Sequence, residues 1–566
     1  MPYSHESCKC KHHHKLHHSD SDSDSDKCCY VKSVNMRQKL NHPGVLSIND
    51  NVTKELIPWS PPDPIAAVGK NRVICMTNVL VVIKNKHTME ETYRDSTRDF
   101  FNVASLGTPF TPPFDPYLVY DEFSDRFFLV AFVPGFYGLP NDPDSTIWFA
   151  VSKNSCPNTK DDFYIYTYRG SNLADYPKIA TDRDALYLSV NEFLPPTYVT
   201  YYPRVTAFRK SSLLSGDPLE IVFDHIFGSP VDEEVGDNTK FIWPCQPRPS
   251  KCHKYSDNVI LAQLIQDDTN TGNTVRIHTV KHILSCPKLI STDITVERFN
   301  IGVNARIPQP PLVEFSPPEP IIPLEVVYRI LSGVIVNGSL WITFAKEVET
   351  VNGPLIGSQW CEIDVRKLLC HHHKAKLIQE GTALPGTTDN TWSPAINVDD
   401  DGNMAIAFSV AGIQKFPSIE YTGRLKCDPK GTVRTPFHVA REGTLYYQLI
   451  QPGTSRNRWG DYSGLLLDPC DHKTFWLFNQ YPIQGSESLG GFFNPYDSAW
   501  NTLLASFCIQ EGEADMQNAP QTQSSYGHSS CPKQIVKKVS KKALITTVIN
   551  GKEVQIPTNT SIPLSL

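Results

Sequence analysis

The sequence predicts an all-β protein and, within that class, a seven-bladed β-propeller, with six blades as the alternative. Three observations lead to this expectation. A group of tight-turn residues followed by a short apolar strand occurs seven times along the chain. The copies follow one another at steps of roughly 50 to 80 residues, whereas a four-stranded blade needs about 40 to 45, which leaves the rest for loops. The 45 prolines and 31 glycines suit a loop-rich β protein better than a helical one.

The clearest copy begins at Arg458-Trp-Gly-Asp-Tyr-Ser463. This polar entry segment precedes two apolar runs of strand length, Leu465–Leu467 and Phe475–Phe478, and the Asp468-Pro pair between the runs is a strong turn signal. A two-stranded hairpin is only marginally stable alone. We therefore expect it to be one member of a repeated series or part of a larger sheet.

In every copy the turn residues precede an apolar run that we interpret as the second strand of a blade. The seven expected second strands are Arg72–Thr77, Arg126–Phe132, Ala185–Val190, Asn258–Gln263, Ser339–Phe344, Asn403–Phe408 and Lys473–Phe478. We expect one closed domain between about Pro61 and Ile509, in which the fourth copy is the weakest.

Four segments are expected along the chain. Residues 1–55 are a His/Cys/Ser-Asp-rich arm with too little apolar surface to fold, so its removal is expected to leave the core intact. Residues 60–510 are the propeller, and residues 511–535 are a linker rich in Gln, Ser and Asn. Residues 536–566 form a small C-terminal hairpin and tail, because Asn-Gly separates two alternating runs there.

The N-terminal arm carries residues that bind soft and borderline metals, but their spacing fits no closed zinc module. We therefore predict no metal site and no cofactor, and we expect a disordered, adhesive or trafficking arm. The weak candidate ligands are Cys8, Cys10, His12, His14, Cys28 and Cys29.

Charge and hydropathy exclude several classes of protein. A net charge of −7 over 566 residues gives no reason to expect a nucleic-acid surface. No apolar h-region follows the first methionine and no apolar run is long enough to span a membrane, so neither a signal peptide nor a membrane span is expected. The 15 cysteines lie mostly singly, which is typical of reduced thiols in a cytosol-like compartment.

Several motifs in their order along the chain carry a resemblance to a known family. They are Asp115-Pro with Tyr120-Asp and Asp125-Arg-Phe, Asp175-Tyr-Pro-Lys178, Pro417-Ser-Ile-Glu-Tyr-Thr-Gly-Arg424, and Arg458-Trp-Gly-Asp-Tyr-Ser463 with the Asp468-Pro turn and Phe475-Trp476. In these motifs the chain resembles a family of mostly uncharacterised seven-bladed β-propellers, loosely sialidase-like in shape. The resemblance covers roughly residues 60 to 510, although the fourth blade and a Pro-rich connector at about 306–323 depart from the pattern.

The tails resemble, in composition, the arms of giant DNA virus proteins of the mimivirus kind. That resemblance implies a protein made in the host cytoplasm, with the virus particle (virion) as a second location.

Sialidase-type hydrolysis needs an arginine cluster, a tyrosine nucleophile with a carboxylate base, and an aspartic acid. Residues of the right types are Arg424, Arg458, Tyr421, Tyr462 and Asp461, and Trp459 belongs to the same motif. Packing and turn formation explain the same motif equally well, and the Ser-x-Asp-x-Gly-x-x-Trp signature of sialidases is missing at the blade turns. The Asp399–Gly402 turn has the hard oxygens that calcium prefers, but a plain hairpin turn is the favoured interpretation.

Two functional hypotheses remain open at this point. The first is a non-catalytic structural or interaction propeller that binds a protein or glycan partner through its blade loops. The second is a sialidase-like protein that binds glycans or hydrolyses glycosides. The sequence favours the first, and it names no ligand.

Overall fold

The computed structural model has two compact units, residues 1–512 and residues 513–566. Each is described separately below. The residues that the structure describes are 34–46, 61–78, 80–103, 112–134, 145–170, 172–228, 231–232, 241–249, 258–267, 271–300, 306–311, 318–323, 329–369, 374–450, 456–484, 498–511, 544–549 and 552–557.

The first unit is built from antiparallel units of four strands, here called blades. Blade one has β2 (Ile65–Val68), β3 (Arg72–Thr77), β4 (Leu80–Asn85) and β5 (Glu91–Ser96), and blade two has β6 (Phe114–Asp121), β7 (Arg126–Val133), β8 (Thr146–Ser152) and β9 (Phe163–Arg169). Blade three has β10 (Leu173–Thr181), β11 (Ala185–Phe193), β12 (Thr200–Arg209) and β13 (Ile221–Ile226), and β14 (Val231–Asp232) also pairs with β12. Blades four and five are β15 (Trp243–Pro247), β16 (Ile260–Gln266), β17 (Thr271–Lys281) and β18 (Lys288–Asn300); and β19 (Ile330–Val336), β20 (Ser339–Thr350), β21 (Gly353–Asp364) and β22 (Lys376–Ala383). Blades six and seven are β23 (Asp389–Val398), β24 (Met404–Gly412), β25 (Lys415–Arg424) and β26 (His438–Arg441); and β27 (Gly464–Leu467), β28 (Thr474–Gln484), β29 (Ser498–Glu511) and β1 (Val34–Leu46).

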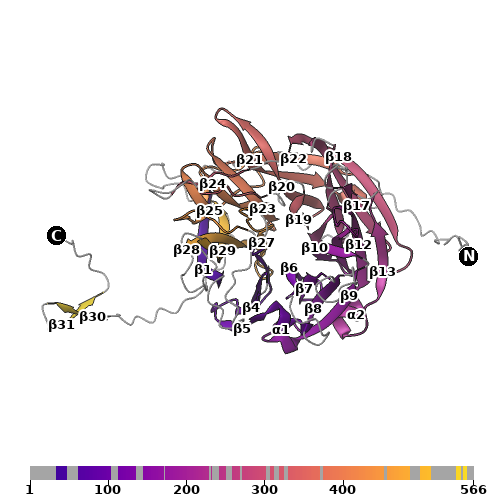
Figure 1. Ribbon diagram of the computed structural model, residues 1–566, viewed down its shortest axis with the longest axis horizontal. Coiled ribbons are helices and arrows are strands. Elements are labelled where there is room, and N and C mark those ends of the chain that lie inside the picture. The colour runs from indigo at the N-terminus through magenta and orange to yellow at the C-terminus, as the bar shows by residue number, and fades with distance from the viewer. Residues whose placement is uncertain are drawn as a thin grey trace, which may run out of the picture. The chain divides into compact units, whose positions relative to one another are not determined.

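Blades four and five share one eight-stranded sheet, because β15 and β19 pair in parallel. The count of seven blades therefore depends on dividing this sheet at the β15–β19 pair. The expectation of an all-β propeller is confirmed: the sheets are arranged around a central axis (Figure 1), and the first strand of each blade contacts the first strand of the next, from β2 through to β27 and back to β2.

All seven second strands predicted from the turn-plus-apolar-run pattern are present, as β3, β7, β11, β16, β20, β24 and β28. These strands lie between neighbouring strands of their own blade and under the next blade, so both of their faces are covered. Every residue of β11 and of β24 is buried. Burial on both faces explains why these runs are continuously apolar rather than alternating.

The last blade draws its outer strand from the other end of the chain. Strand β1 pairs antiparallel with β29, with Val34 opposite Glu511 and Leu46 opposite Asn501. The prediction that residues 1–55 are disordered throughout is therefore corrected for residues 34–46, while residues 1–33 lie outside the described residues. The sequence of β1 contains Pro43 and shows no period of two, so only the free edge of β29 reveals its role.

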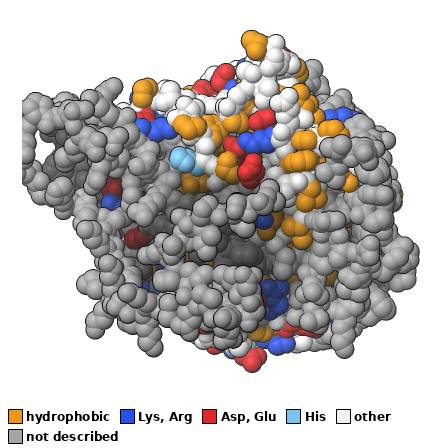
Figure 2. All heavy atoms as spheres, turned by 90° about the vertical axis from the view of Figure 1, so that its left-hand side faces the viewer, with side chains coloured by type: hydrophobic (Ala, Val, Ile, Leu, Met, Phe, Trp, Pro, Cys, Tyr) orange, Lys and Arg blue, Asp and Glu red, His pale blue; other side chains and the backbone are white. Residues whose placement is uncertain are grey.

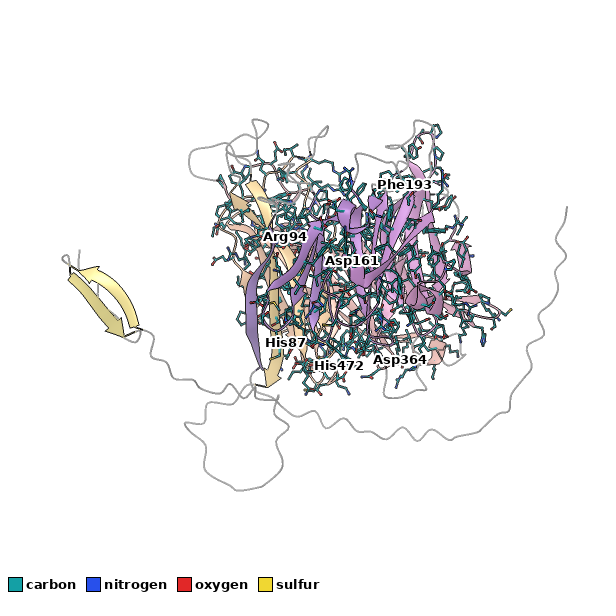
Figure 3. The ribbon with its side chains drawn as sticks, turned by 90° about the horizontal axis from the view of Figure 1, so that it is seen from below. His87, Arg94, Asp161, Phe193, Asp364 and His472 are labelled. Carbon is teal, nitrogen blue, oxygen red and sulfur yellow. The ribbon has the colours of Figure 1, made fainter. Side chains whose placement is uncertain are left out.

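The blades expose two faces, which Figure 3 shows in side view. The turns between first and second strands lie on one face, here called the turn face, which carries His472 and, from other turns, His87 and Asp364. The innermost strands begin at the opposite face, here called the entry face, near the level of Phe193.

Helices are few and short among the described residues. They are α1 (Thr97–Phe100), α2 (Lys210–Ser215), α3 (Arg366–Leu369) and the 3₁₀ turn η3 (Lys160–Asp162). In the described part of the chain, no helix has the length and apolar character needed to cross a membrane. In the second unit, β30 (Leu544–Ile549) and β31 (Lys552–Pro557) pair antiparallel, as the hairpin prediction requires.

Candidate functional site

A ring of residues with unusual backbone conformation surrounds the channel at the entry face. Close to the start of the innermost strand in blades one, two, three, four and six, a residue other than glycine has φ between 46° and 58°. They are Asp63, Asp115, Tyr176, Phe241 and Ser393. Such values are uncommon for residues with a side chain, so tertiary contacts must hold them in place.

Hydrogen bonds to the carboxylate of Asp63 and to the side-chain amide of Asn78 join blades seven, one and two at this ring. The Asp461 backbone N–H donates to Asp63 Oδ1 at 2.6 Å, and Asn78 Nδ2 donates to Asp63 Oδ2 at 2.7 Å. The Asp115 backbone N–H in turn donates to Asn78 Oδ1 at 2.7 Å. Asp63 is fully buried, so these bonds form without competition from water.

The polar groups of the segment before β27 are occupied in the same way. Arg458 Nη2 donates to Asp461 Oδ2 at 2.9 Å, and Tyr462 Oη donates to the Pro116 carbonyl at 2.6 Å. Tyr462 is buried, and burial raises the pKa of its hydroxyl well above the ordinary value. A hydroxyl in this state is a poor nucleophile, because nucleophilic attack requires loss of its proton.

Trp459 anchors this segment in the interior. Its side chain is 2% exposed, and its indole N–H donates to Ser409 Oγ of blade six at 3.2 Å. The ring lies edge-to-face against Trp392 and Tyr447, with centroids 5.4 Å and 4.8 Å away. This packing links blade seven to blade six, so the segment contacts the blades on both sides of it.

Two cations lie in aromatic surroundings inside the ring. Lys178 Nζ lies 3.4 Å from the ring centroid of Tyr176 and 4.1 Å from that of Tyr462, and burial lowers the pKa of this lysine to about 7. The Arg329 guanidinium lies 3.5 Å from the ring centroid of Phe241 and 4.0 Å from that of Tyr176. Both cations are buried, so cation–π attraction replaces part of their lost hydration.

Asp115 differs from the other carboxylates of the ring. No described residue donates a hydrogen bond to its carboxyl oxygens, although its side chain is buried. Burial, followed by the nearby charges of Asp175 and Asp63, raises the pKa of Asp115 well above the usual value. Both causes favour the protonated form of the Asp115 carboxyl. We call the set Asp63, Asp115, Asp175, Lys178, Arg329, Arg458, Asp461 and Tyr462 the entry hub.

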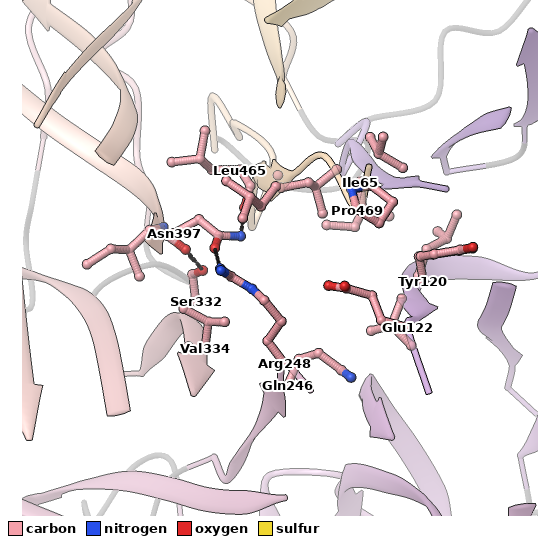
Figure 4. Close-up of a pocket in the computed structure, with 18 of the residues that line it drawn as sticks. Ile65, Tyr120, Glu122, Gln246, Arg248, Ser332, Val334, Asn397, Leu465 and Pro469 are labelled. Atoms are coloured by element: carbon pink, nitrogen blue, oxygen red, sulfur yellow. Dashed lines mark hydrogen bonds between the residues drawn. The ribbon is translucent and has the colours of Figure 1, made fainter. Parts of the chain in front are cut away.

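The channel below the entry hub holds a pocket with a volume of about 110 Å³, lined by innermost strands of six blades (Figure 4). Polar side chains from separate blades meet at its turn-face end. His472 contacts Glu122 at 2.7 Å and Asp400 at 3.1 Å, and Arg248 Nη1 donates to the other oxygen of Asp400 at 3.0 Å. The hydrogen bonds to Asp400 and Glu122 raise the pKa of His472 to about 9.

This pocket is small for a ligand site. Pockets that hold drug-sized ligands measure about 300 to 1,000 Å³. Because Arg248, Asp400, His472 and Glu122 neutralise one another across the channel, the turn-face end of the pocket also presents little net charge to a ligand. We interpret this group of four residues as a tie between blades two, four, six and seven.

The residues proposed as hydrolytic candidates do not converge on one site. Arg424 donates to the Asp428 carbonyl and lies over Trp360, and no Arg458–Tyr462 residue is among its contacts in the described structure. Tyr421 stacks on Phe507 at 4.0 Å in the contact between blades six and seven.

The acidic turn Asp399–Gly402 makes protein contacts with each of its carboxylates. Asn403 donates to Asp399, His472 and Arg248 bind Asp400, and Lys473 pairs with Asp401. The Cys/His candidates of the N-terminal arm lie outside the described residues. Among the residues that are described, no group of three or more His, Cys, Asp or Glu is arranged to hold a metal ion.

Sequence reasoning missed part of the entry hub. Asp63 and Asp115 both precede a proline near the start of an innermost strand, so this repeat was a usable signal. Asn78 and Arg329 stand in no motif. Their roles depend on which turns and connections the ring brings together, and no local pattern shows that.

The chain matches no protein-family model and no curated protein. Among solved structures it is similar to extracellular domains 1-2 of Drosophila Semaphorin 1b, with 10% identity, coverage of 82% of this chain and 88% of that chain, and a TM-score of 0.35. It is also similar to the subtype N10 neuraminidase-like protein of A/little yellow-shouldered bat/Guatemala, with 6% identity, coverage of 69% and 99%, and a TM-score of 0.33. A third is Cellvibrio cellulosa α-L-arabinanase complexed with arabinohexaose, with 10% identity, coverage of 56% and 95%, and a TM-score of 0.26. These likenesses concern the fold and carry no statement about activity.

Proposed function

We propose that this protein is a non-catalytic interaction propeller that binds a protein partner through loops of its entry face. The observation that carries the non-catalytic part is the state of the Arg458–Tyr462 segment. The Asp461 carboxylate is bound by Arg458 and the Asp461 backbone N–H by Asp63, while the Tyr462 hydroxyl donates to the Pro116 carbonyl. Asp63, Asp461 and Tyr462 are buried, and Arg458 is partly buried. Groups held in this way act as ties between blades rather than as reagents.

Exposed aliphatic side chains support the choice of face. Val351 in the turn between β20 and β21 is 92% exposed, Ile413 occupies the corresponding turn between β24 and β25, and Ile450 lies on the connection from β26 to β27. Single exposed aliphatic residues are common on proteins. Here three of them lie on loops of the same face, in blades five and six, and an aliphatic surface suits a protein partner better than a glycan.

The charge distribution agrees with a protein partner rather than a nucleic acid. On the side of the molecule that Figure 2 shows, the acidic and basic side chains of the described residues are few and lie scattered among hydrophobic and uncharged ones. A nucleic-acid surface needs a continuous basic region.

Photo-cross-linking tests the proposed face. A photoreactive amino acid replaces Val351 or Ile413 in cells that make the protein. Val439 on outer strand β26, which is 47% exposed, serves as a control outside the loops of the entry face. We expect both entry-face positions to capture the same protein and the control to capture none. No adduct at either position, or identical adducts at all three, contradicts the proposal, and binding to a glycan array without a protein adduct replaces the protein partner by a glycan.

We also propose the particle of a giant DNA virus as a location of the protein. The support is the composition of the N-terminal arm, which resembles that of such virus proteins. Mass spectrometry of purified particles is the direct measurement. If the protein is abundant in infected cytoplasm and missing from the particles, this location is contradicted.

One observation favours the alternative of a carbohydrate enzyme, namely the Asp115 carboxyl. Burial raises the pKa of Asp115, and a raised carboxyl pKa favours the protonated form that a general acid needs. A glycosidase screen on the wild type tests this alternative. If a hydrolytic activity is found and disappears in a stably folded Asp115→Asn or Asp461→Asn protein, the entry hub is catalytic and the interaction proposal is overturned.

A further inference from the structure

A lysine and a cysteine meet where the ring of blades closes. Lys86 follows β4 in blade one, and Cys470 lies in the turn between β27 and β28 of blade seven. Lys86 Nζ is 3.4 Å from Cys470 Sγ. His87, which follows Lys86 directly, and His472, which lies two residues after Cys470, are both on the turn face in Figure 3.

The two groups are held in position by a third residue. Lys86 Nζ donates to Asp468 Oδ1 at 2.9 Å, and the backbone N–H of Cys470 donates to the same oxygen at 2.9 Å. Asp468 Oδ2 in turn accepts a bond from the Trp476 indole at 3.1 Å. One buried carboxylate therefore fixes both the ammonium group and the backbone that carries the thiol.

Lys86 and Cys470 differ in their exposure to solvent. The Lys86 side chain is 5% exposed, so its amine is shielded from competing reagents, whereas Cys470 is a free and exposed cysteine. A small oxidant therefore reaches the thiol first, and the nearest amine is already in contact with the sulfur.

We propose that Lys86 and Cys470 form a covalent nitrogen–oxygen–sulfur bridge when the protein meets hydrogen peroxide. One S–H and one N–H bond are lost, and an S–O and an N–O bond form to a single oxygen atom. Two molecules of peroxide are reduced and three molecules of water are released, while Asp468 is placed to take the extra proton of the ammonium group. The bridge joins blades one and seven covalently and locks the ring, and a thiol reductant reverses it.

Peptide mass spectrometry of the full chain tests the bridge. After peroxide treatment we expect the Lys86 and Cys470 peptides as one species, with the summed mass plus one oxygen and minus two hydrogens. Dithiothreitol should separate them. Cys156 is a matched control, since it is also solvent-reachable and no described lysine contacts its sulfur, so its peptide should gain oxygen only.

Two variants and one physical measurement complete the test. Lys86→Arg retains the positive charge opposite Asp468, and Cys470→Ser retains the turn, so both should fold without forming the bridge. Peroxide should raise the melting temperature of the wild type and of neither variant, and reductant should remove the rise. Oxygen gained on Cys470 with an unlinked Lys86 peptide, or a linked species without the extra oxygen, overturns the proposal directly in the wild-type chain.

Discussion

Replacement of Trp459 by alanine is expected to destabilise the propeller strongly, because the indole fills the contact between blades six and seven. A tryptophan buries about 200 Å². At about 25 cal/mol per Å², its loss removes about 5 kcal/mol as an upper estimate. Substitutions of this kind cost about 3 to 5 kcal/mol when the site is well packed, and Trp459, at 2% exposed between Trp392 and Tyr447, is such a site. We therefore expect a loss of about 3 to 5 kcal/mol in the free energy of unfolding.

Urea unfolding, followed by far-ultraviolet circular dichroism and tryptophan fluorescence, measures this loss, provided that the two probes give one transition. Trp459→Phe is the matched control. It retains an aromatic ring but loses the indole N–H, and Ser409 still has Asn479 as a partner, so it should cost only about 1 to 2 kcal/mol. A loss below about 1 kcal/mol for Trp459→Ala would refute the view that this segment ties the blades together.

Three further outcomes are expected. Removal of residues 1–33 should leave the melting temperature nearly unchanged. Removal of residues 1–48 should lower the melting temperature and promote aggregation, because the edge of β29 loses its partner strand β1. Equal melting temperatures of the two truncated proteins contradict this role of β1. Asp115→Asn should be at least as stable as the wild type at pH 7 and lose any advantage near pH 4. The reason is that the pKa of the Asp115 carboxyl is higher in the folded than in the unfolded protein, so the wild type loses stability as the pH rises above the unfolded-state pKa. A variant that is less stable than the wild type at pH 7 contradicts this reasoning. Lys210→Met should cost about 3 to 5 kcal/mol in the free energy of unfolding, because it removes the ammonium group that lies 2.9 Å from the buried carboxylate of Asp121. Asp121→Asn in the same chain should recover part of this loss in urea unfolding. If the effects of the two substitutions simply add, the two residues are not coupled.

Local sequence patterns determined the repeating part of this protein. Turn residues followed by continuous apolar runs predict the second strands, because these strands are covered on both faces and so need apolar side chains throughout. The predicted Arg72–Thr77 and the observed β3 have the same bounds, and the prediction for β11 starts at the same residue, Ala185. The Asn-Gly signal of the C-terminal hairpin is equally local, since the register follows from the turn.

The tertiary structure decided how the ring closes and what surrounds its axis. Strand β1 becomes a strand only because β29 offers an unpaired edge far away in the sequence. Lys178 and Arg329 meet the same tyrosine ring of Tyr176 although they come from blades three and five. Such contacts depend on the angle between blades and on the order in which they are joined. A local sequence pattern predicts the spacing of strands within one blade. Contacts across the channel form only when all of the blades are assembled, so no local pattern predicts them.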